Sequence, residues 1–204
     1  MEVILIRHGK TAGNIEHRYQ GRTDEPLCEI GISELRQKQQ QGYYPQPETI
    51  VCSPKKRCVQ TAQIICPDFY KPYEIESGLT ETDFGDFEGK TYEELKENSD
   101  YLSWLQSNGE GAIPNGESRL EMSERSCSAF VRQVEKAQKN SCQRCMMVIH
   151  GGSIMAIMER FAQGNRSFYD FHVKNGEGFI MQITDWNPNK RYPTRSLIQR
   201  EEEK

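Results

Sequence analysis

The sequence predicts an α/β fold of three layers, in which a mostly parallel central sheet has helices on both faces. Four short, continuous apolar runs are typical of strands buried on both sides: residues 3–6, 49–52, 146–149 and 179–183. Helical patterns separate these runs, and strands that alternate with helices form a largely parallel sheet. The 204 residues are enough for one domain of this kind.

Three segments between the strands have the pattern of helices. A helix is expected over residues 55–65, and a deeply packed one over residues 152–162, which are apolar all round. A long helix is expected after residue 118, because apolar or small residues recur there at steps of three and four: Leu120, Ser123, Cys127, Phe130, Val134 and Ala137.

Residues 84–118 interrupt this alternation with glycines and a proline. We expect a small helical insertion at about residues 90–116, similar to a lid, rather than a separate domain. Its apolar side chains are Leu95, Tyr101, Trp104 and Leu105. One hypothesis is that the insertion forms an aromatic wall for the ring of a small ligand, with Tyr92, Tyr101 and Trp104. The end of the chain, about residues 190–204, is expected to be frayed.

Composition excludes several functions. The net charge of −4 argues against nonspecific binding to nucleic acid or to an anionic membrane. No apolar stretch is long enough for a membrane span, and the N-terminus does not resemble a signal peptide, so we expect a cytoplasmic protein. Seven cysteines fit free thiols in a reducing compartment. Cys142 and Cys145 have the CxxC spacing, but nothing completes a zinc site, so a structural role is favoured over a metal or redox role.

Polar residues follow three of the predicted strands. The first run ends in Arg7-His8-Gly9, the second in Ser53-Pro54 before a helix that carries Arg57, and the third in His150-Gly151. Ligands of an open parallel sheet bind beyond the carboxyl ends of its strands. These residues are therefore expected to meet at one edge of the sheet.

Such a cluster suits a phosphoryl group. Arg7 and Arg57 offer planar, permanently charged forks that match phosphoryl oxygens. His8 is able to attack phosphorus or take a proton, and His150 to donate hydrogen bonds to the oxygens. A further neutral donor is Asn14, and the best acid for the leaving group is Glu81, in the loop of residues 79–89.

Each residue alone has a simpler interpretation. A histidine at a strand end is more often a capping or packing residue, Arg57 a solvated helix arginine, and Glu81 a surface acid. Their joint placement at one sheet edge weakens these interpretations. His17 and His172 are still interpreted as surface or structural residues.

The segment LIRHGKTAGN resembles the signature of the histidine phosphatase superfamily, the phosphoglycerate-mutase-like proteins. Further segments extend the resemblance in the same order over about residues 2–185: YQGRTDEPLCEIG, CSPKKRCVQTA, LTETDFGDFEG, PNGES and VIHGG. The resemblance implies that the whole chain, residues 1–204, is one histidine phosphatase domain.

The resemblance also implies roles for individual residues. His8 would be the nucleophile that forms a phosphohistidine, and Glu81 would protonate the leaving alcohol and then activate water. Arg7, Arg57 and His150 would hold the phosphoryl oxygens. Asn14, Gln20, Gly21 and the backbone of Gly151 would line the same pocket. No metal or other cofactor is required.

A phosphatase is favoured over a mutase, because Glu81 is not followed by the arginine-histidine pair with which the resembling mutases grip a carboxylate. Among phosphatases, the resemblance is greatest to those acting on α-ribazole 5′-phosphate in cobalamin nucleotide-loop assembly. A broad-specificity sugar-phosphate or nucleotide phosphatase is the alternative, followed by a phosphoglycerate mutase and a catalytically inactive phosphate-binding member. A phosphoprotein phosphatase would need a wider cleft. The expected partner is a small phosphorylated metabolite, not nucleic acid or a membrane, and the chain is expected to be a monomer or homodimer.

Overall fold

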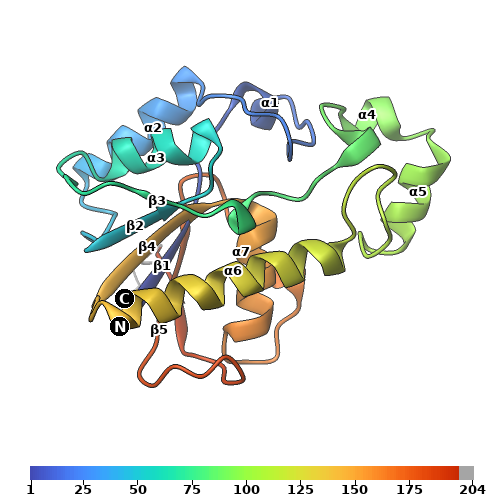
Figure 1. Ribbon diagram of the computed structural model, residues 1–204. Helices are drawn as coiled ribbons and strands as arrows, with labels where there is room; N and C mark the ends of the chain where they lie inside the picture. The colour runs from blue at the N-terminus through green and yellow to red at the C-terminus, as the bar shows by residue number, and fades with distance from the viewer. Residues whose placement is uncertain (198–204) are drawn as a thin grey trace, which may run out of the picture.

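In the computed structural model, which describes residues 1–197, a six-stranded sheet lies between two layers of helices (Figure 1). Its strands are β1 (Glu2–Arg7), β2 (Thr49–Cys52), β3 (Glu74–Ile75), β4 (Arg144–Ile149), β5 (Gly178–Gln182) and β6 (Thr194–Ser196). The three-layer α/β fold expected from the sequence is confirmed.

The sheet has the order β3-β2-β4-β1-β5-β6. β1 and β2 both run parallel to β4, and β3 runs parallel to β2. β5 is antiparallel to β1, with Ile6 opposite Gly178, and β6 is antiparallel to β5. The fourth apolar run is therefore a strand, but its direction places its N-terminal end beside the carboxyl end of β1. The segment before β5 reaches the functional edge of the sheet for this reason.

Two cores fill the faces of the sheet, because alternate side chains of a strand point to opposite faces. Val3 and Leu5 of β1 belong to one core, and Ile4 and Ile6 to the other. The first core packs under α6 (Arg119–Lys139) and α7 (Gly151–Phe161), and the second under α2 (Glu29–Gln40) and α3 (Lys56–Ile65). All four runs expected to be buried on both faces are thus covered by helices.

The three helices predicted between the strands, α3, α6 and α7, begin within one residue of the expected positions, whereas α2 was not predicted. Ser118 caps α6, since its side chain accepts from the N–H of Glu121 while the Glu121 carboxylate accepts from Ser118. The apolar stripe of α6 begins at Met122, which is buried. Leu120, expected in that stripe, is 66% exposed, because it lies in the first turn, before the helix reaches the core.

Residues 90–116 carry α4 (Tyr92–Leu95) and α5 (Ser99–Gln106), which extend beyond the sheet on one side (Figure 1). A third, small core holds this part together: Phe87, Leu95, Tyr101 and Ile113. Tyr101 is 1% exposed and Tyr92 is exposed, so of the three aromatic residues expected to form a wall only Trp104 lines the cavity described below.

The frayed end expected from about residue 190 is wrong for residues 190–197. Tyr192 and Leu197 are buried, and β6 adds a strand to the sheet. The rest of the expected tail, residues 198–204, lies outside the described residues. All seven cysteines, including Cys142 and Cys145, are unpaired thiols.

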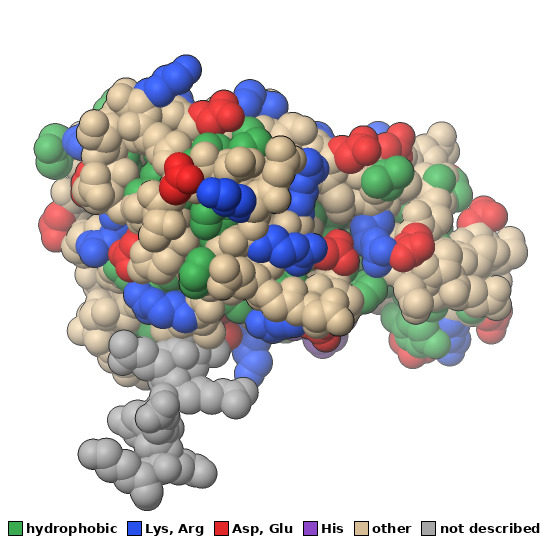
Figure 2. Space-filling model, turned by 90° about the horizontal axis from the view of Figure 1, so that it is seen from below, with side chains coloured by type: hydrophobic (Ala, Val, Ile, Leu, Met, Phe, Trp, Pro, Cys, Tyr) green, Lys and Arg blue, Asp and Glu red, His purple; other side chains and the backbone are tan. Residues whose placement is uncertain are grey.

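Charges on the protein surface are mixed. On the face shown in Figure 2, Lys and Arg side chains lie among Asp and Glu side chains. Within residues 1–197, no helix combines the length and apolar character needed to cross a membrane.

Candidate active site

His8 lies at the loop that follows β1 and is 4% exposed. Its Nδ1–H donates to the carbonyl of Gly9 at 2.7 Å, which leaves the lone pair on Nε2. Burial, and then the charges of Arg57 and Arg7, hold the pKa of His8 well below its usual value. The ring is therefore neutral near pH 7, as a nucleophilic imidazole must be.

Arg57, in the first turn of α3, is fully buried. Its Nη1 donates to the carbonyl of Thr23 at 2.6 Å, and its Nη2 to the carbonyl of Gln20 at 3.3 Å. Nη2 also lies 3.4 Å from Nδ1 of His150. Its Nε is buried and has no hydrogen-bond partner among residues 1–197. A buried cation with an unused donor is the arrangement that an oxyanion would complete.

Arg7, the last residue of β1, is oriented by a hydrogen bond from Nη1 to the carbonyl of Val173 at 2.7 Å. Within the described part of the chain its Nε is also buried without a partner. Burial lowers the pKa of Arg7, and Glu81 counters this effect, but a guanidinium stays charged throughout the working pH range. Two guanidinium groups therefore flank the buried imidazole of His8.

His150 caps the N-terminus of α7, and its ring lies edge-on to that of His8 with centroids 5.2 Å apart. Its Nε2 lies 2.8 Å from Oγ of Ser53. Because a guanidinium only donates, Nδ1 accepts from Arg57 and Nε2–H donates to Ser53 in this structure. A hydroxyl both donates and accepts, so Ser53 supports either tautomer of the ring. Burial, with His8 and Arg57, keeps the pKa of His150 well below its usual value.

Glu81 is held between its own loop and the first turn of α7. Its Oε1 accepts from the N–H of Thr82 at 2.9 Å and its Oε2 from the N–H of Gly152 at 3.2 Å. A Cβ at position 152 would lie 2.3 Å from Oε1 of Glu81, whereas a Cβ at Gly151 would meet Arg7 at an ordinary 3.4 Å. Gly152 is thus the glycine that makes room for the Glu81 carboxylate. The N–H of Gly151, in the first turn of α7, has no partner within the helix.

The early loop around Gln20 and Gly21 closes over Arg57. The structure does not bring the Gln20 side chain to His8, because Nε2 donates to Glu25 at 2.6 Å and Oε1 accepts from Thr11 at 2.7 Å. Gln20 contributes its backbone carbonyl to Arg57 instead. At Gly21, a Cβ would lie 1.7 Å from the carbonyl of Thr82, so only glycine allows this loop to cross the segment that carries Glu81.

Asn14 lies in the short helix α1 (Ala12–Ile15), where its Oδ1 accepts from Nδ2 of Asn175 at 3.2 Å. Asn175 also donates to the carbonyl of His8 at 3.0 Å. The sequence reasoning missed Asn175, because it follows from the antiparallel direction of β5. Ser53 was expected at this sheet edge, after the second apolar run, but was given no role.

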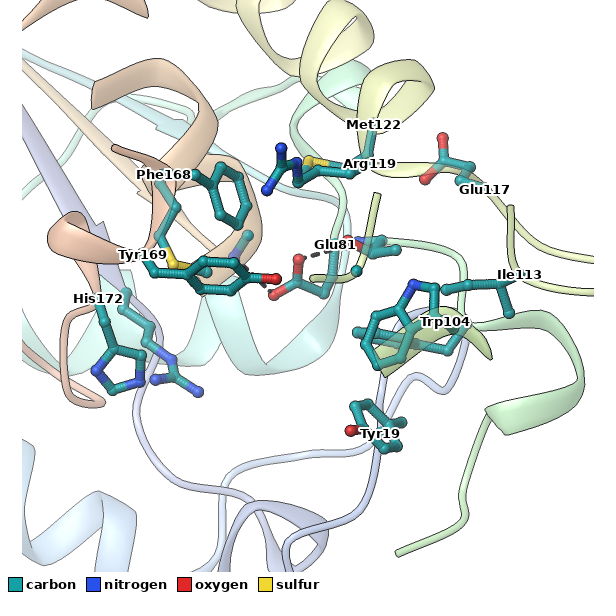
Figure 3. Close-up of a pocket in the computed structure, with 17 residues that line it drawn as sticks. Tyr19, Glu81, Trp104, Ile113, Glu117, Arg119, Met122, Phe168, Tyr169 and His172 are labelled. Atoms are coloured by element: carbon teal, nitrogen blue, oxygen red, sulfur yellow. Dashed lines mark hydrogen bonds between the residues drawn. The ribbon is translucent and has the colours of Figure 1, made fainter. Parts of the chain in front are cut away.

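A cavity of about 200 Å³, which we call the aromatic cavity, extends from Arg7 and Glu81 (Figure 3). Trp104 and Tyr19 lie on one side of Glu81 in this view, and Phe168 and Tyr169 on the other. The aromatic and methionine side chains around it come from distant parts of the chain: Tyr19, Phe84, Trp104, Met122, Met155, Phe168 and Tyr169. An apolar cavity beside a carboxyl group suits the organic part of a phosphomonoester.

The geometry has a clear chemical capacity. A neutral imidazole with a free Nε2 lies among two guanidinium groups and a second imidazole, and a carboxyl group lies beside an apolar cavity. Such a set is able to neutralise a phosphoryl dianion, attack its phosphorus and exchange a proton with the leaving oxygen. The fold and this set define a protein that handles phosphoryl groups.

Comparison with known proteins names the family. The model of the histidine phosphatase superfamily (branch 1) matches residues 3–192, and the chain therefore belongs to this superfamily. The resemblance found in the sequence is confirmed.

Several relatives are named as phosphatases, and others as probable phosphoglycerate mutases. The chain is 31% identical to a metal-independent phosphoserine phosphatase of Arabidopsis thaliana, over 80% of this chain and 70% of that protein. It is 27% identical to an adenosylcobalamin/alpha-ribazole phosphatase of Salmonella typhimurium, over 86% of this chain and 87% of that protein. Together with the superfamily match, these relatives show that the protein is a phosphatase.

Solved structures agree with the fold. The alpha-ribazole phosphatase from Shigella flexneri superposes with a TM-score of 0.81 at 26% identity, covering 96% of this chain and 95% of that one. A phosphoglycerate mutase from Thermus thermophilus superposes with a TM-score of 0.68 at 26% identity, covering 94% of this chain and 96% of that one.

Proposed function

We propose that this phosphatase hydrolyses a small phosphomonoester without a metal ion, through a phosphohistidine on His8. The observation that carries the proposal is the free Nε2 of a buried, neutral His8 beside Arg7 and Arg57. Two fixed positive charges supply the charge neutralisation that a divalent cation gives in other phosphoryl-transfer enzymes. We place the activity in the cytoplasm.

The proposed reaction has two steps. Nε2 of His8 attacks phosphorus, the P–O bond to the alcohol breaks, and the Glu81 carboxylic acid gives its proton to the leaving oxygen. Glu81 then takes a proton from water, whose oxygen attacks phosphorus as the N–P bond breaks. Inorganic phosphate leaves, and both His8 and Glu81 return to their starting states.

Arg7, Arg57 and His150 hold the phosphoryl oxygens in this scheme, with help from Asn14 and the N–H of Gly151. His150 needs its proton on Nδ1 to donate to an oxygen. Ser53 permits this form, because its hydroxyl then donates to Nε2 rather than accepting from it. The side chain of Gln20 has no part, since Glu25 and Thr11 occupy it.

For the substrate, α-ribazole 5′-phosphate in cobalamin nucleotide-loop assembly is the first candidate. Relatives named as alpha-ribazole phosphatases and the aromatic cavity beside Glu81 both support a nucleotide with an aromatic base. A broad-specificity sugar-phosphate or nucleotide phosphatase is the second candidate, since relatives with other named substrates match at similar identity.

The test of the reaction is hydrolysis of 4-nitrophenyl phosphate with a strong metal chelator present, comparing the wild type with His8→Ala. We expect undiminished activity with chelator, an acid-labile phosphoenzyme, and loss of nearly all turnover in His8→Ala. Activity that requires a metal, or that survives the substitution, contradicts the proposal. A panel of α-ribazole 5′-phosphate, nucleotides and phosphoglycerates then ranks the substrates.

A further inference from the structure

A second cavity opens from Arg7, and its character differs from that of the aromatic cavity. It holds about 560 Å³, and we call it the cationic groove. Arg7, Tyr19 and His172 line both cavities, so the groove and the aromatic cavity are neighbours at the proposed phosphoryl site.

The lining of the groove is basic. Lys10, Arg18 and Lys174 join Arg7 there, and the lining residues, all within residues 1–197, include neither Asp nor Glu. This differs from the face in Figure 2, where both signs of charge are mixed. In a protein of net charge −4, a hollow lined by one sign of charge focuses the electrostatic field on what enters it.

Not all of these cations are equally available. Lys10 pairs with Glu34, and Arg18 pairs with Glu16 and Glu94, outside the groove. Lys174 is exposed and has no carboxylate partner among the described residues. Arg7 likewise has no salt bridge there, and the proposed phosphoryl group takes its charge. Lys174 is therefore the cation left for a second ligand group.

An amide donor lies beside this cation. Asn14 lines the groove, and because its Oδ1 accepts from Asn175, its Nδ2 is the donor that faces a ligand. Asn175 donates to the carbonyl of His8 and to Asn14, so it positions Asn14 rather than binding the ligand. A carboxylate or a second phosphoryl group binds best where a cation and an amide donor converge in this way. An uncharged alcohol would leave Lys174 without a partner.

From this arrangement we propose that the cationic groove binds a second anionic group of the substrate, a carboxylate or a phosphoryl group, with Lys174 as its cation. The inference rests on the proposed phosphomonoesterase function and names the substrate class. It disfavours α-ribazole 5′-phosphate, the first substrate candidate, because that molecule has one phosphoryl group and leaves the groove empty. Within the second candidate it favours phosphomonoesters that carry a further carboxylate or phosphoryl group.

The experiment uses substrates that differ by one carboxylate. Dissociation constants are measured on the His8→Ala variant, so that turnover does not interfere, for 3-phosphoglycerate against glycerol 3-phosphate and for phosphoserine against phosphoethanolamine. Fructose 1,6-bisphosphate against fructose 6-phosphate tests a second phosphoryl group. We expect the member with the second anion to bind at least about five-fold more tightly in one of these three pairs or more.

Adding Lys174→Gln should reduce this ratio to about one in each pair that shows the preference. Lys139→Gln removes the same charge from the exposed end of α6 and serves as the matched control, which should keep the ratio. Equal affinities within all three pairs, or a ratio that Lys174→Gln leaves intact, overturns the inference. So does an equal loss for both members of a pair, since the groove would then only attract any phosphomonoester.

Failure of this inference and failure of the proposed function give different results. If the wild type hydrolyses no phosphomonoester, the proposed function fails, while the binding ratios on the His8→Ala variant still test the groove. If hydrolysis occurs but the ratios are equal, the proposed function stands and the groove proposal fails.

Discussion

The cluster around His8 and the aromatic cavity next to it are built in different ways. The cluster uses residues within a few positions of three parallel strand ends, and His8, Arg57 and His150 in it are buried. The cavity uses side chains from the early loop, the Glu81 loop, the insertion, α6, α7 and the segment before β5. One arrangement is fixed by the sheet itself, and the other depends on how distant segments pack.

This difference suggests a division of tasks. A sheet edge holds donors and a nucleophile within fractions of an ångström, as phosphoryl transfer requires. Walls assembled from loops and an insertion change shape with few consequences for the sheet. The proposed chemistry therefore belongs to the cluster and the choice of substrate to the walls. Substitutions in the two regions should differ in kind as well as in size.

The largest effect among these tests is expected from Arg57→Ala, which removes a buried phosphoryl donor of the cluster. We expect kcat/KM for 4-nitrophenyl phosphate to fall by about 10²–10³. Arg144→Ala, at the opposite end of β4, is the control, because it removes a partly buried guanidinium that is bonded to Glu2 and lies away from the cluster. A loss below ten-fold in a folded Arg57→Ala protein would remove Arg57 from the proposed mechanism.

Most of the cluster could be predicted from the sequence, for a physical reason. His8 and His150 directly follow apolar runs, and parallel strands bring such ends together. Ser53 follows the same rule, but the sequence alone gave it no partner, and the structure pairs it with His150. The side chain of Gln20 could not be placed, because its hydrogen bonds to Glu25 and Thr11 depend on the path of a loop.

The layers of the fold were predictable from the sequence, but the direction of every strand was not. The apolar run before residue 183 indicates a strand without showing which way it runs, so the antiparallel β5 was not foreseen. For that reason Asn175 and Lys174 were not expected at the site. His172, expected as a surface or structural residue, is exposed and lines both cavities. Leu120 fits the helical period but lies before the core begins, which periodicity alone does not reveal.

A smaller loss is expected where the cluster meets the Glu81 loop. Gly152→Ala places a Cβ 2.3 Å from Oε1 of Glu81, so the carboxyl group must move. We expect kcat to fall by about 10- to 100-fold, since displacements of about 1 Å have effects of this size. The same change at Gly151 meets only Arg7, at 3.4 Å, and should cost much less. Equal losses in the two variants would show that the position of Glu81 is not limiting.

The buried histidines of the cluster should also make stability depend on pH. His8 and His150 have folded pKa values well below the value of about 6.5 expected in the unfolded chain. The unfolded state therefore binds more protons below pH 6.5, and the free energy of unfolding falls as the pH decreases from there. The expected slope is about 1.4 kcal/mol per pH unit for each histidine.

Urea unfolding between pH 6.5 and 5 measures this slope above the range where the lowered carboxylate pKa values contribute. His150→Gln should lower the number of protons taken up on unfolding by about one, and the double variant with His8→Gln should lower it by about two. The slope should fall in proportion. A slope that neither substitution reduces would mean that these rings are not held neutral by the fold.

The smallest effect is expected in the wall of the aromatic cavity, and it should be selective. Trp104→Ala removes a ring that lines the cavity but leaves the cluster untouched (Figure 3). We expect kcat/KM for adenosine 5′-monophosphate to fall about five-fold more than that for ribose 5-phosphate, because only the nucleotide has a base to pack against the indole. Trp104→Phe keeps an aromatic face and should recover most of the difference. Equal losses for the two substrates would place the base outside this cavity. Specificity for the base would then have to come from a different part of the protein surface.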